Sequence, residues 1–412
     1  MDVEMATWKS TGTYVDAVPP PWANIVDGMW IFRVKRPPGS LPVFKARYMA
    51  RGFNQRQGVD YFHTFSPTPK MTTLQVLLHV AAQRDYELHS LDFSTAFLQG
   101  SLHEEIWLRC PPGFTGLFLA GTQWSIRRPV YGLYHVPHEW PDTLRTMLAA
   151  LGFARLTADP SLFLRTDTSL PPFYILVYVN DLVFATVDTE ALALVKLELQ
   201  KRHTCTDLGE PRSYLGLQIT LDRARRTITP TQVLRYLYST PGMGLVLGGR
   251  GPIVLTGHAD ASWVDDLATQ WSSHVYTLSL GSGSVSWRST RSSSVLDSSC
   301  EAEIYAWAMA AQELRWLTYL LNDLGEQPRS PPVLYVDNKA MIALCQEHKT
   351  KHIALRYFLA RDLQQCGQLL LAYVTTRANI ADIFTRALPP GDHQRFSTVL
   401  GLVPILPHLL TA

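Results

Sequence analysis

Cysteine is scarce and dispersed in this chain of 412 residues. No CxxC pair occurs among the five cysteines, which are Cys110, Cys205, Cys300, Cys345 and Cys366. This spacing argues against a zinc site and against a disulfide framework. It suits a protein kept in a reducing compartment.

Long apolar runs are missing as well. No uninterrupted apolar segment approaches the roughly 20 residues that a membrane-spanning helix needs. Residues 1–10 carry acidic side chains and no apolar core, so they do not fit a secretory signal. We therefore expect a soluble intracellular protein with no membrane partner.

Charge is sparse, at 17% of residues, whereas 46% are hydrophobic. Such a composition excludes wholesale disorder and can fill the cores of two or three domains. The net charge of +2 is too small to indicate nucleic-acid binding. The segment 33–56, however, has seven basic residues and no acidic one: Arg33, Lys35, Arg36, Lys45, Arg47, Arg51 and Arg56. It is either a phosphate-binding patch or a solvated basic face.

The first half of the chain alternates strand and helix patterns. A hairpin is predicted from residues 29–35 and 44–51, a helix over 72–83 and a strand over 88–92. Two apolar runs, 173–179 and 182–185, predict a tight hairpin with Asn180 and Asp181 at its tip, and a helix follows over 189–202.

The second half begins after a glycine-rich stretch at 242–251, which indicates a domain boundary. A mixed pattern of three strands, a long helix, a strand, a helix and a strand follows: 253–259, 275–280, 284–288, 299–324, 333–336, 340–346 and 369–374. This order predicts an α/β domain with a mixed sheet.

Asp92 and Asp181 are candidates for a polymerase site. Asp92 ends a predicted strand and Asp181 lies at a predicted hairpin tip. Carboxylates at strand ends can hold the two Mg²⁺ ions with which a polymerase joins a 3′-hydroxyl to a triphosphate. Each residue taken alone is better explained as an ordinary loop aspartate.

The strings around these residues narrow the choice. FKARYMARGFNQRQGVDYFHTFSP (44–67), LDFSTAFLQGSLHEEIWLRCPPGF (91–114), VYGL (130–133), YVND (178–181) and DLGEPRSYLGLQI (207–219) occur in one order. This order resembles the reverse transcriptase of copia-type retrotransposons over residues 20–230. The resemblance implies an RNA template as partner, Asp92 and Asp181 as metal-binding catalytic residues, and Lys45 and Arg47 as triphosphate contacts.

The resemblance also implies that Phe97 is an aromatic gate that would exclude a ribose 2′-hydroxyl. A buried core position is the alternative for Phe97.

Three departures from the family pattern point to an impaired polymerase. Asn180 stands where the family has the first aspartate of YVDD, which removes a charge that Mg²⁺ prefers. Tyr134 and His135 replace a lysine and a glutamine that would face the nucleotide, and Glu139 adds an acid. The string at 227–232 runs directly into 233–237, so the thumb expected between them is missing.

Four carboxylates in the second half are candidates for a nuclease site. Asp260 and Asp337 end predicted strands, Glu303 lies in the first turn of the long helix, and Asp382 opens a helix. A two-metal nuclease needs three or four carboxylates from separate elements. The alternative is that Glu303 only complements the helix dipole and Asp382 only caps a helix.

The strings GHADASW, VSWRSTRSSSVLDSSCEAEIYA, YVDNKAMIAL, TKHIALRYF and ANIADIFTRAL are similar to the copia-type RNase H over residues 252–395. This similarity implies cleavage of RNA in RNA–DNA hybrids with Mg²⁺ or Mn²⁺. It assigns the metal to Asp260, Glu303, Asp337 and Asp382, with Glu301 as a second choice, and the hybrid backbone to Lys351, His352 and Arg356.

The expected fold class is therefore α/β: α+β fingers and palm of a reverse transcriptase, then an RNase H-like domain. The expected boundaries are a poorly structured segment at 1–20, fingers and palm at 21–232, a remnant linker at 233–251, the RNase H-like domain at 252–395 and a tail at 396–412. We expect a piece of a longer polyprotein. The alternative function is a non-catalytic nucleic-acid binder or a decayed pseudoenzyme fragment.

Overall fold

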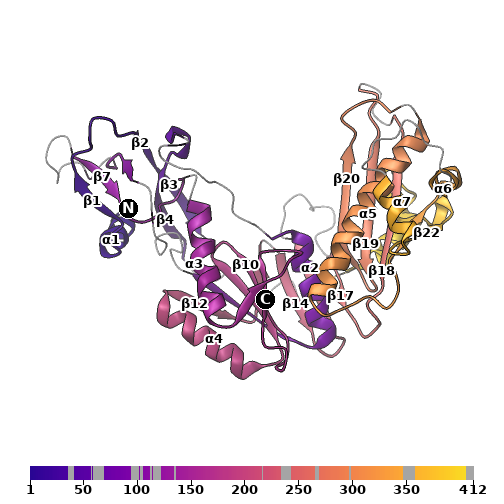
Figure 1. Ribbon diagram of the computed structural model, residues 1–412, viewed down its shortest axis with the longest axis horizontal. Coiled ribbons are helices and arrows are strands. Elements are labelled where there is room, and N and C mark those ends of the chain that lie inside the picture. Colours follow the sequence, from indigo (N-terminus) through magenta and orange to yellow (C-terminus); the bar gives the residue numbers. More distant parts are fainter. Residues whose placement is uncertain are drawn as a thin grey trace.

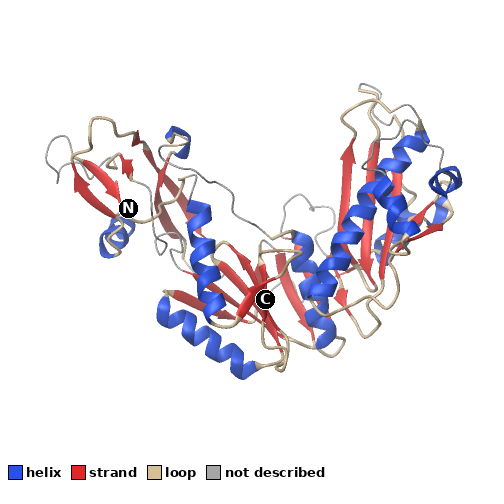
Figure 2. Ribbon diagram, in the orientation of Figure 1, coloured by secondary structure: helices blue, strands red, loops and turns tan. Residues whose placement is uncertain are grey.

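The computed structural model has the α/β architecture expected from the sequence (Figures 1 and 2). It describes residues 1–35, 41–56, 58, 69–93, 102, 105–111, 114, 122–133, 136–215, 217–232, 243–264, 269–296, 298–346 and 358–404. None of the helices in these ranges is long and apolar enough to cross a membrane. An N-terminal part, a central domain and a C-terminal domain follow one another along the longest axis in Figure 1.

The N-terminal part contains a helix, α1 (Asp2–Ser10), and a small sheet. The expectation of a poorly structured segment at 1–20 is wrong, because Trp8 on α1 is fully buried against the rings of Tyr48 and Trp124. The strands of the sheet, in order, are β1 (Tyr14–Ala17), β7 (Gln123–Ile126), β6 (Ile106–Leu108) and β2 (Ile25–Val26).

The expected basic hairpin is confirmed. Strand β3 (Gly28–Lys35) pairs antiparallel with β4 (Val43–Ala50), and a 3-10 turn, η1 (Gly52–Asn54), follows. Arg33 lies opposite Lys45 in this pairing. Cross-strand partners share a face, so two cations stand side by side on the ribbon.

The central domain is a sheet with helices on both faces. Helix α2 (Met71–Arg84) packs on one face, and α3 (Val136–Ala150) and α4 (Thr189–Arg202) pack on the other. Strand β10 (Phe173–Tyr178) is apolar throughout because alternate residues face these two cores. The strand order is β12 (Cys205–Gly209), β5 (Glu87–Phe93), β11 (Asp181–Thr186), β10 (Phe173–Tyr178), β9 (Leu162–Arg165) and β8 (Phe153–Arg155).

The expected linker and tail are both folded where the structure describes them. Strand β16 (Met243–Leu245) of the expected linker pairs with β23 (Leu402–Pro404) of the expected tail. This pairing corrects the boundaries, since the two segments hold each other. A neighbouring sheet has the order β13 (Ser213–Tyr214), β14 (Leu217–Asp222), β15 (Thr227–Gln232) and β17 (Leu247–Gly248).

The C-terminal domain is a mixed sheet with the long helix α5 (Ser299–Asp323) along one face (Figure 2). Its strand order is β20 (Ser284–Arg291), β19 (Ser273–Leu280), β18 (Leu255–Ser262), β21 (Val333–Val336) and β22 (Leu370–Tyr373). The other helical segments are α6 (Lys339–Gln346), α7 (Phe358–Gln365), η6 (Thr376–Ala378), η7 (Ile380–Phe384) and α8 (Pro390–Val399).

The central and C-terminal domains share one hydrophobic core. Leu77 on α2 and Leu317 on α5 belong to the same buried cluster. Arg84 forms two hydrogen bonds of 2.5 Å with the carboxylate of Glu326, and the indole of Trp316 donates to the Ala158 carbonyl at 2.9 Å. The two domains are therefore packed together directly.

Candidate active sites

The polymerase candidates Asp92 and Asp181 lie directly opposite each other. Strands β5 and β11 are antiparallel neighbours, and their register pairs these two aspartates. Asn180, at the hairpin tip between β10 and β11, donates its side-chain amide to Asp92 Oδ1 at 2.5 Å. An uncharged amide therefore occupies the place where the sequence pattern leads us to expect a third carboxylate.

The hairpin tip is fixed by contacts from two sides. Val179 has φ +57°, a left-handed conformation that is costly for a β-branched residue. The Trp140 indole donates to the Val179 carbonyl at 2.6 Å, and the Tyr214 hydroxyl donates to the Asp181 carbonyl at 3.3 Å. Burial, together with the facing Asp92, raises the pKa of Asp181 to about 6.

The other polymerase candidates are less tightly organised. Lys45 and Arg47 are exposed on β4, and the Arg47 guanidinium lies 4.8 Å from the centre of the Tyr131 ring. Tyr131 belongs to the quoted string VYGL, but no local pattern in the sequence predicts its contact with Arg47. Phe97, Tyr134 and His135 lie outside the described residues, as does the side chain of Glu139. The assigned roles of these residues stay predictions.

The nuclease candidates Asp260, Asp337 and Asp382 converge in space. Within the described residues, one carboxylate oxygen from each lies within 4.8 Å of the others. Strands β18 and β21 are parallel neighbours, so Asp260 near the end of one meets Asp337 just beyond the end of the other. Strand β18 continues two residues past Asp260, whereas we expected it to end there.

Asp382 is brought to this edge by a 3-10 helix, η7, and not by the start of an α-helix. The fully buried Asn379 caps η7 by accepting from the Ala381 backbone N–H, and its amide donates to the Ala259 carbonyl on β18 at 3.0 Å. Asn379 therefore ties the Asp382 segment to the strand that carries Asp260. The place of Asn379, three residues before Asp382, is the signal in the sequence that could have identified it.

Glu303 adjoins the three aspartates, but not from the first turn of α5. Ser298 caps the helix, and Glu301 is the acid in its first turn. Glu303 therefore lies in the second turn. Its Oε2 atom is buried without a hydrogen-bond partner among the described residues. Burial, reinforced by Asp260 and Asp337, raises the pKa of Glu303 to about 9.

The electrostatics of this cluster favour a bound cation. Burial is the main cause that raises the pKa of Asp260 to about 7; a hydrogen bond of 2.7 Å from the Thr385 hydroxyl opposes the shift, and Asp382 and Asp337 add to it. Arg386 forms an ion pair with Asp382 on the exposed side. Oxygen ligands crowded together in this way suit a hard divalent ion. Lys351, His352 and Arg356 lie outside the described residues, so their contacts stay predictions.

Comparison with known proteins agrees with the order of the motifs. The pattern of the family described as "Reverse transcriptase (RNA-dependent DNA polymerase)" matches residues 14–239. The Retrovirus-related Pol polyprotein from transposon RE2 of Arabidopsis thaliana is 32% identical over 477 residues, which cover 94% of this chain and 33% of the relative. The polyprotein from transposon RE1 of the same plant is 30% identical, and the alignment covers 95% of this chain and 33% of that polyprotein.

Among solved structures, the foamy viral protease–reverse transcriptase in complex with an RNA/DNA hybrid has a TM-score of 0.48 and 12% identity, covering 91% of this chain and 54% of that one. The present chain spans about a third of the length of the plant polyproteins. The family pattern covers more than half of the chain. The chain therefore belongs to the reverse transcriptase (RNA-dependent DNA polymerase) family, in its copia-type retrotransposon Pol branch.

Proposed function

We propose that the C-terminal domain of this chain cleaves the RNA strand of RNA–DNA hybrids with Mg²⁺ or Mn²⁺, and that the polymerase site is impaired. The observation that carries the proposal is the convergence of Asp260, Asp337 and Asp382 within 4.8 Å, with Glu303 beside them. Three or four carboxylates drawn from separate elements are the ligand set that two-metal hydrolysis requires.

The residues present fit a divalent cation. The orphaned Oε2 of Glu303 and the raised pKa of Asp260 both indicate negative charge that is buried without enough positive charge to balance it. When bound, the metal would activate a water molecule and stabilise the leaving oxygen. Asn379, Thr385 and Arg386 would hold the aspartates in position through the contacts described above.

The test is cleavage of an end-labelled RNA–DNA hybrid by the full chain in Mg²⁺. Asp337→Asn keeps the shape of the side chain and removes one charge, so we expect the rate to fall at least about a hundredfold. Glu303→Gln should reduce the rate similarly. Glu301→Gln is the matched control on the same helix, and it should cleave at the normal rate.

Equal cleavage by the wild type and Asp337→Asn would sink the nuclease proposal. Loss of cleavage in Glu301→Gln, with Glu303→Gln still active, would transfer the ligand role to Glu301. Hybrid binding without any cleavage in the wild type would favour the alternative, a non-catalytic nucleic-acid binder.

The impaired polymerase rests on the amide of Asn180 against Asp92. A neutral amide that already donates to one carboxylate gives Mg²⁺ a weaker site than a third carboxylate would. The alignment with the first plant relative is 477 residues long, more than this whole chain, so that relative has residues that this chain lacks, as a deleted thumb would require. If the lost charge costs on the order of 4 kcal/mol in the transition state, extension falls about a thousandfold.

Primer extension on an RNA template tests this second part. We expect no measurable extension by the wild type. Normal extension would show that Asn180 is tolerated. Asn180→Asp should restore some synthesis only if the remaining chain still grips the duplex.

A further inference from the structure

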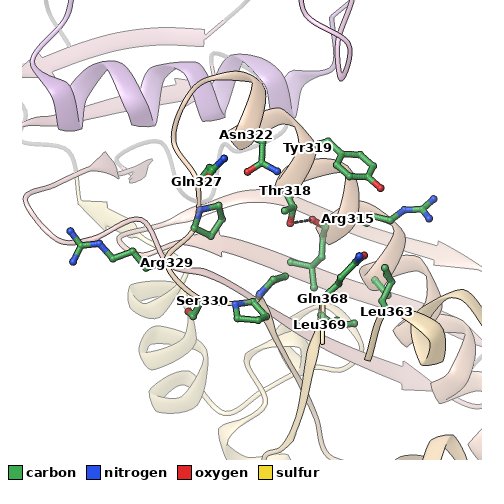
Figure 3. A pocket seen from close by; sticks show the side chains of 15 residues that line it. Arg315, Thr318, Tyr319, Asn322, Gln327, Arg329, Ser330, Leu363, Gln368 and Leu369 are labelled. Carbon is green, nitrogen blue, oxygen red and sulfur yellow. Dashed lines mark hydrogen bonds between the residues drawn. The ribbon is translucent and has the colours of Figure 1, made fainter. Parts of the chain in front are cut away.

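A groove of about 460 Å³ lies on the C-terminal domain (Figure 3). Its volume falls in the range of small-ligand sites. It is formed by the second half of α5, the connection from α5 to β21, the end of α7 and the residue pair before β22. Its polar lining includes Arg315, Tyr319, Asn322, Gln327, Arg329 and Gln368.

The groove and the nuclease site lie at opposite ends of β21. Pro331 and Pro332 line the groove immediately before the strand begins at Val333, whereas Asp337 follows its last residue. Strand β22 runs parallel to β21, and Leu369, directly before it, also lines the groove. A ligand in the groove would therefore not occupy the metal site.

The charge of the groove is positive. Arg315 and Arg329 contribute to the lining, and the described lining residues include no acid. Three acids close to the groove, Glu313, Asp323 and Glu326, are engaged by the central domain. Glu326 pairs with Arg84, Asp323 accepts from the Ala158 backbone N–H at 2.8 Å, and Glu313 lies 3.8 Å from Lys70. Packing against the central domain therefore leaves the arginines of the groove available for an anion.

The remaining lining residues suit bases. Tyr319 is 52% exposed, and a tyrosine ring at a groove is a surface on which an unstacked base can lie. Asn322, Gln327 and Gln368 supply amides that can both donate and accept hydrogen bonds to base edges. In Figure 3, Arg315 and Arg329 lie on opposite sides of the groove, so a strand that crosses the groove and continues past its rim could contact both.

We propose that this groove binds a single-stranded nucleic acid, with a base on Tyr319 and backbone phosphates at Arg315 and Arg329. A duplex would not fit this chemistry, because its bases are stacked and paired and cannot reach the ring. The site goes beyond the proposed nuclease: it needs no metal and no cleavage. RNA and DNA share the chemistry that would be recognised, so both are tested.

The experiment measures fluorescence anisotropy of labelled U8 and T8 with the full chain in EDTA. Tyr319→Ala should weaken binding about tenfold, because stacking on one ring is lost, whereas Tyr319→Phe should bind within twofold of the wild type. Arg315→Ala combined with Arg329→Ala should also weaken binding about tenfold and flatten the salt dependence. Tighter U8 than T8 binding would identify RNA as the preferred strand.

Two controls match these variants. Tyr373→Ala removes a tyrosine of the same domain with similar exposure outside the groove, and Arg225→Ala removes an exposed arginine of the neighbouring sheet. Both should bind the oligonucleotides as the wild type does. Unchanged binding in the Tyr319 and arginine variants would overturn the proposal. Displacement of U8 by UMP at equal concentration would also overturn it, because a mononucleotide site would then explain the groove.

The outcome is separable from that of the nuclease. Asp337→Asn should lose hybrid cleavage and still bind U8, whereas Tyr319→Ala should cleave a blunt hybrid within twofold of the wild-type rate. Loss of U8 binding in Asp337→Asn would place the single strand at the metal site and contradict a separate groove.

Discussion

At the scale of single residues, the carboxylates of Asp260, Asp337, Asp382 and Glu303 lie close enough to repel one another when they are charged. Asp260 and Asp382 are almost fully buried, and Glu303 carries a buried oxygen without a partner among the described residues. Burial, with the neighbouring carboxylates adding to it, raises the pKa of Asp260 and of Glu303, and an anionic form of either residue destabilises the protein without metal. The proposed metal binding and the stability of the metal-free protein are therefore opposed at this edge of the sheet.

This opposition predicts that Asp337→Asn is more stable than the wild type without metal. Removal of one charge should raise the melting temperature in EDTA by a few degrees. Saturating Mg²⁺ should stabilise the wild type more than the variant, since only the wild type retains the full ligand set. Calorimetry with and without Mg²⁺ measures both effects. Identical melting temperatures in EDTA would mean that the carboxylates do not repel one another.

His79 predicts a separate dependence on pH. Burial lowers the pKa of His79 to about 4, and its Nδ1 accepts from the Gly248 backbone N–H. The unfolded chain binds a proton near pH 6.5 while the folded state does not, so stability is complete above that pH and falls as the pH drops toward 4. At pH 5.5 the loss from this residue is about 1.4 kcal/mol.

His79→Gln should remove that part of the pH dependence. Urea unfolding at pH 7.5 and 5.5 gives the two free energies of unfolding, and the difference between them should be smaller in the variant than in the wild type. The comparison uses this difference because the substitution also changes packing on α2. An equal difference in both proteins would show that His79 is protonated in the folded state.

At the scale of elements, the contact between α2 and the end of α5 joins the two domains. Arg84 at the end of α2 holds Glu326 through two hydrogen bonds, and the Glu326 side chain is only 10% exposed. A buried carboxylate that loses its partner is costly, whereas an exposed ion pair contributes little.

Arg84→Ala should therefore destabilise the protein by about 1–2 kcal/mol, less than a fully buried pair because Arg84 is half exposed. The matched control is Arg225→Ala, whose partner Asp222 is exposed, and it should leave the stability unchanged. Urea unfolding of the two variants provides the comparison. An equally small effect in both would assign the interface to apolar packing alone.

At the scale of the whole molecule, a strand near the C-terminus pairs with a strand between the central and C-terminal domains. These strands are β23 and β16, and the Val246 backbone N–H donates to the Gly401 carbonyl at 2.8 Å. Leu245 of β16 belongs to the hydrophobic cluster that also contains residues of α2, β17 and α5. We therefore expect one cooperative unfolding transition for these two domains.

Truncation tests this pairing. A chain that ends at Gly401 loses β23, leaves β16 without its partner and should melt at a lower temperature than the wild type. A chain that ends at Pro404 keeps β23 and is the matched control, so its melting temperature should be higher than that of the shorter chain. Equal melting temperatures for the two truncated chains would show that the β16–β23 pairing does not stabilise the fold.

Local patterns in the sequence were sufficient for many elements. Helix α4 and strand β21 have the predicted bounds, and the apolar runs on either side of Asn180 form the predicted hairpin. These features depend on hydrogen bonds within a segment or across a tight turn, so the side-chain period records them. The order of the motifs along the chain was likewise sufficient to identify the copia-type reverse transcriptase family.

Tertiary structure alone decided the features that join distant residues. The folding of residues 1–20 depends on the burial of Trp8 against Trp124, and the closure of β16 on β23 joins segments that the sequence pattern left as linker and tail. The meeting of Asp260 with Asp382 requires Asn379 to bridge to β18. Such contacts form between residues more than a hundred positions apart, where no local periodicity carries information about the partner.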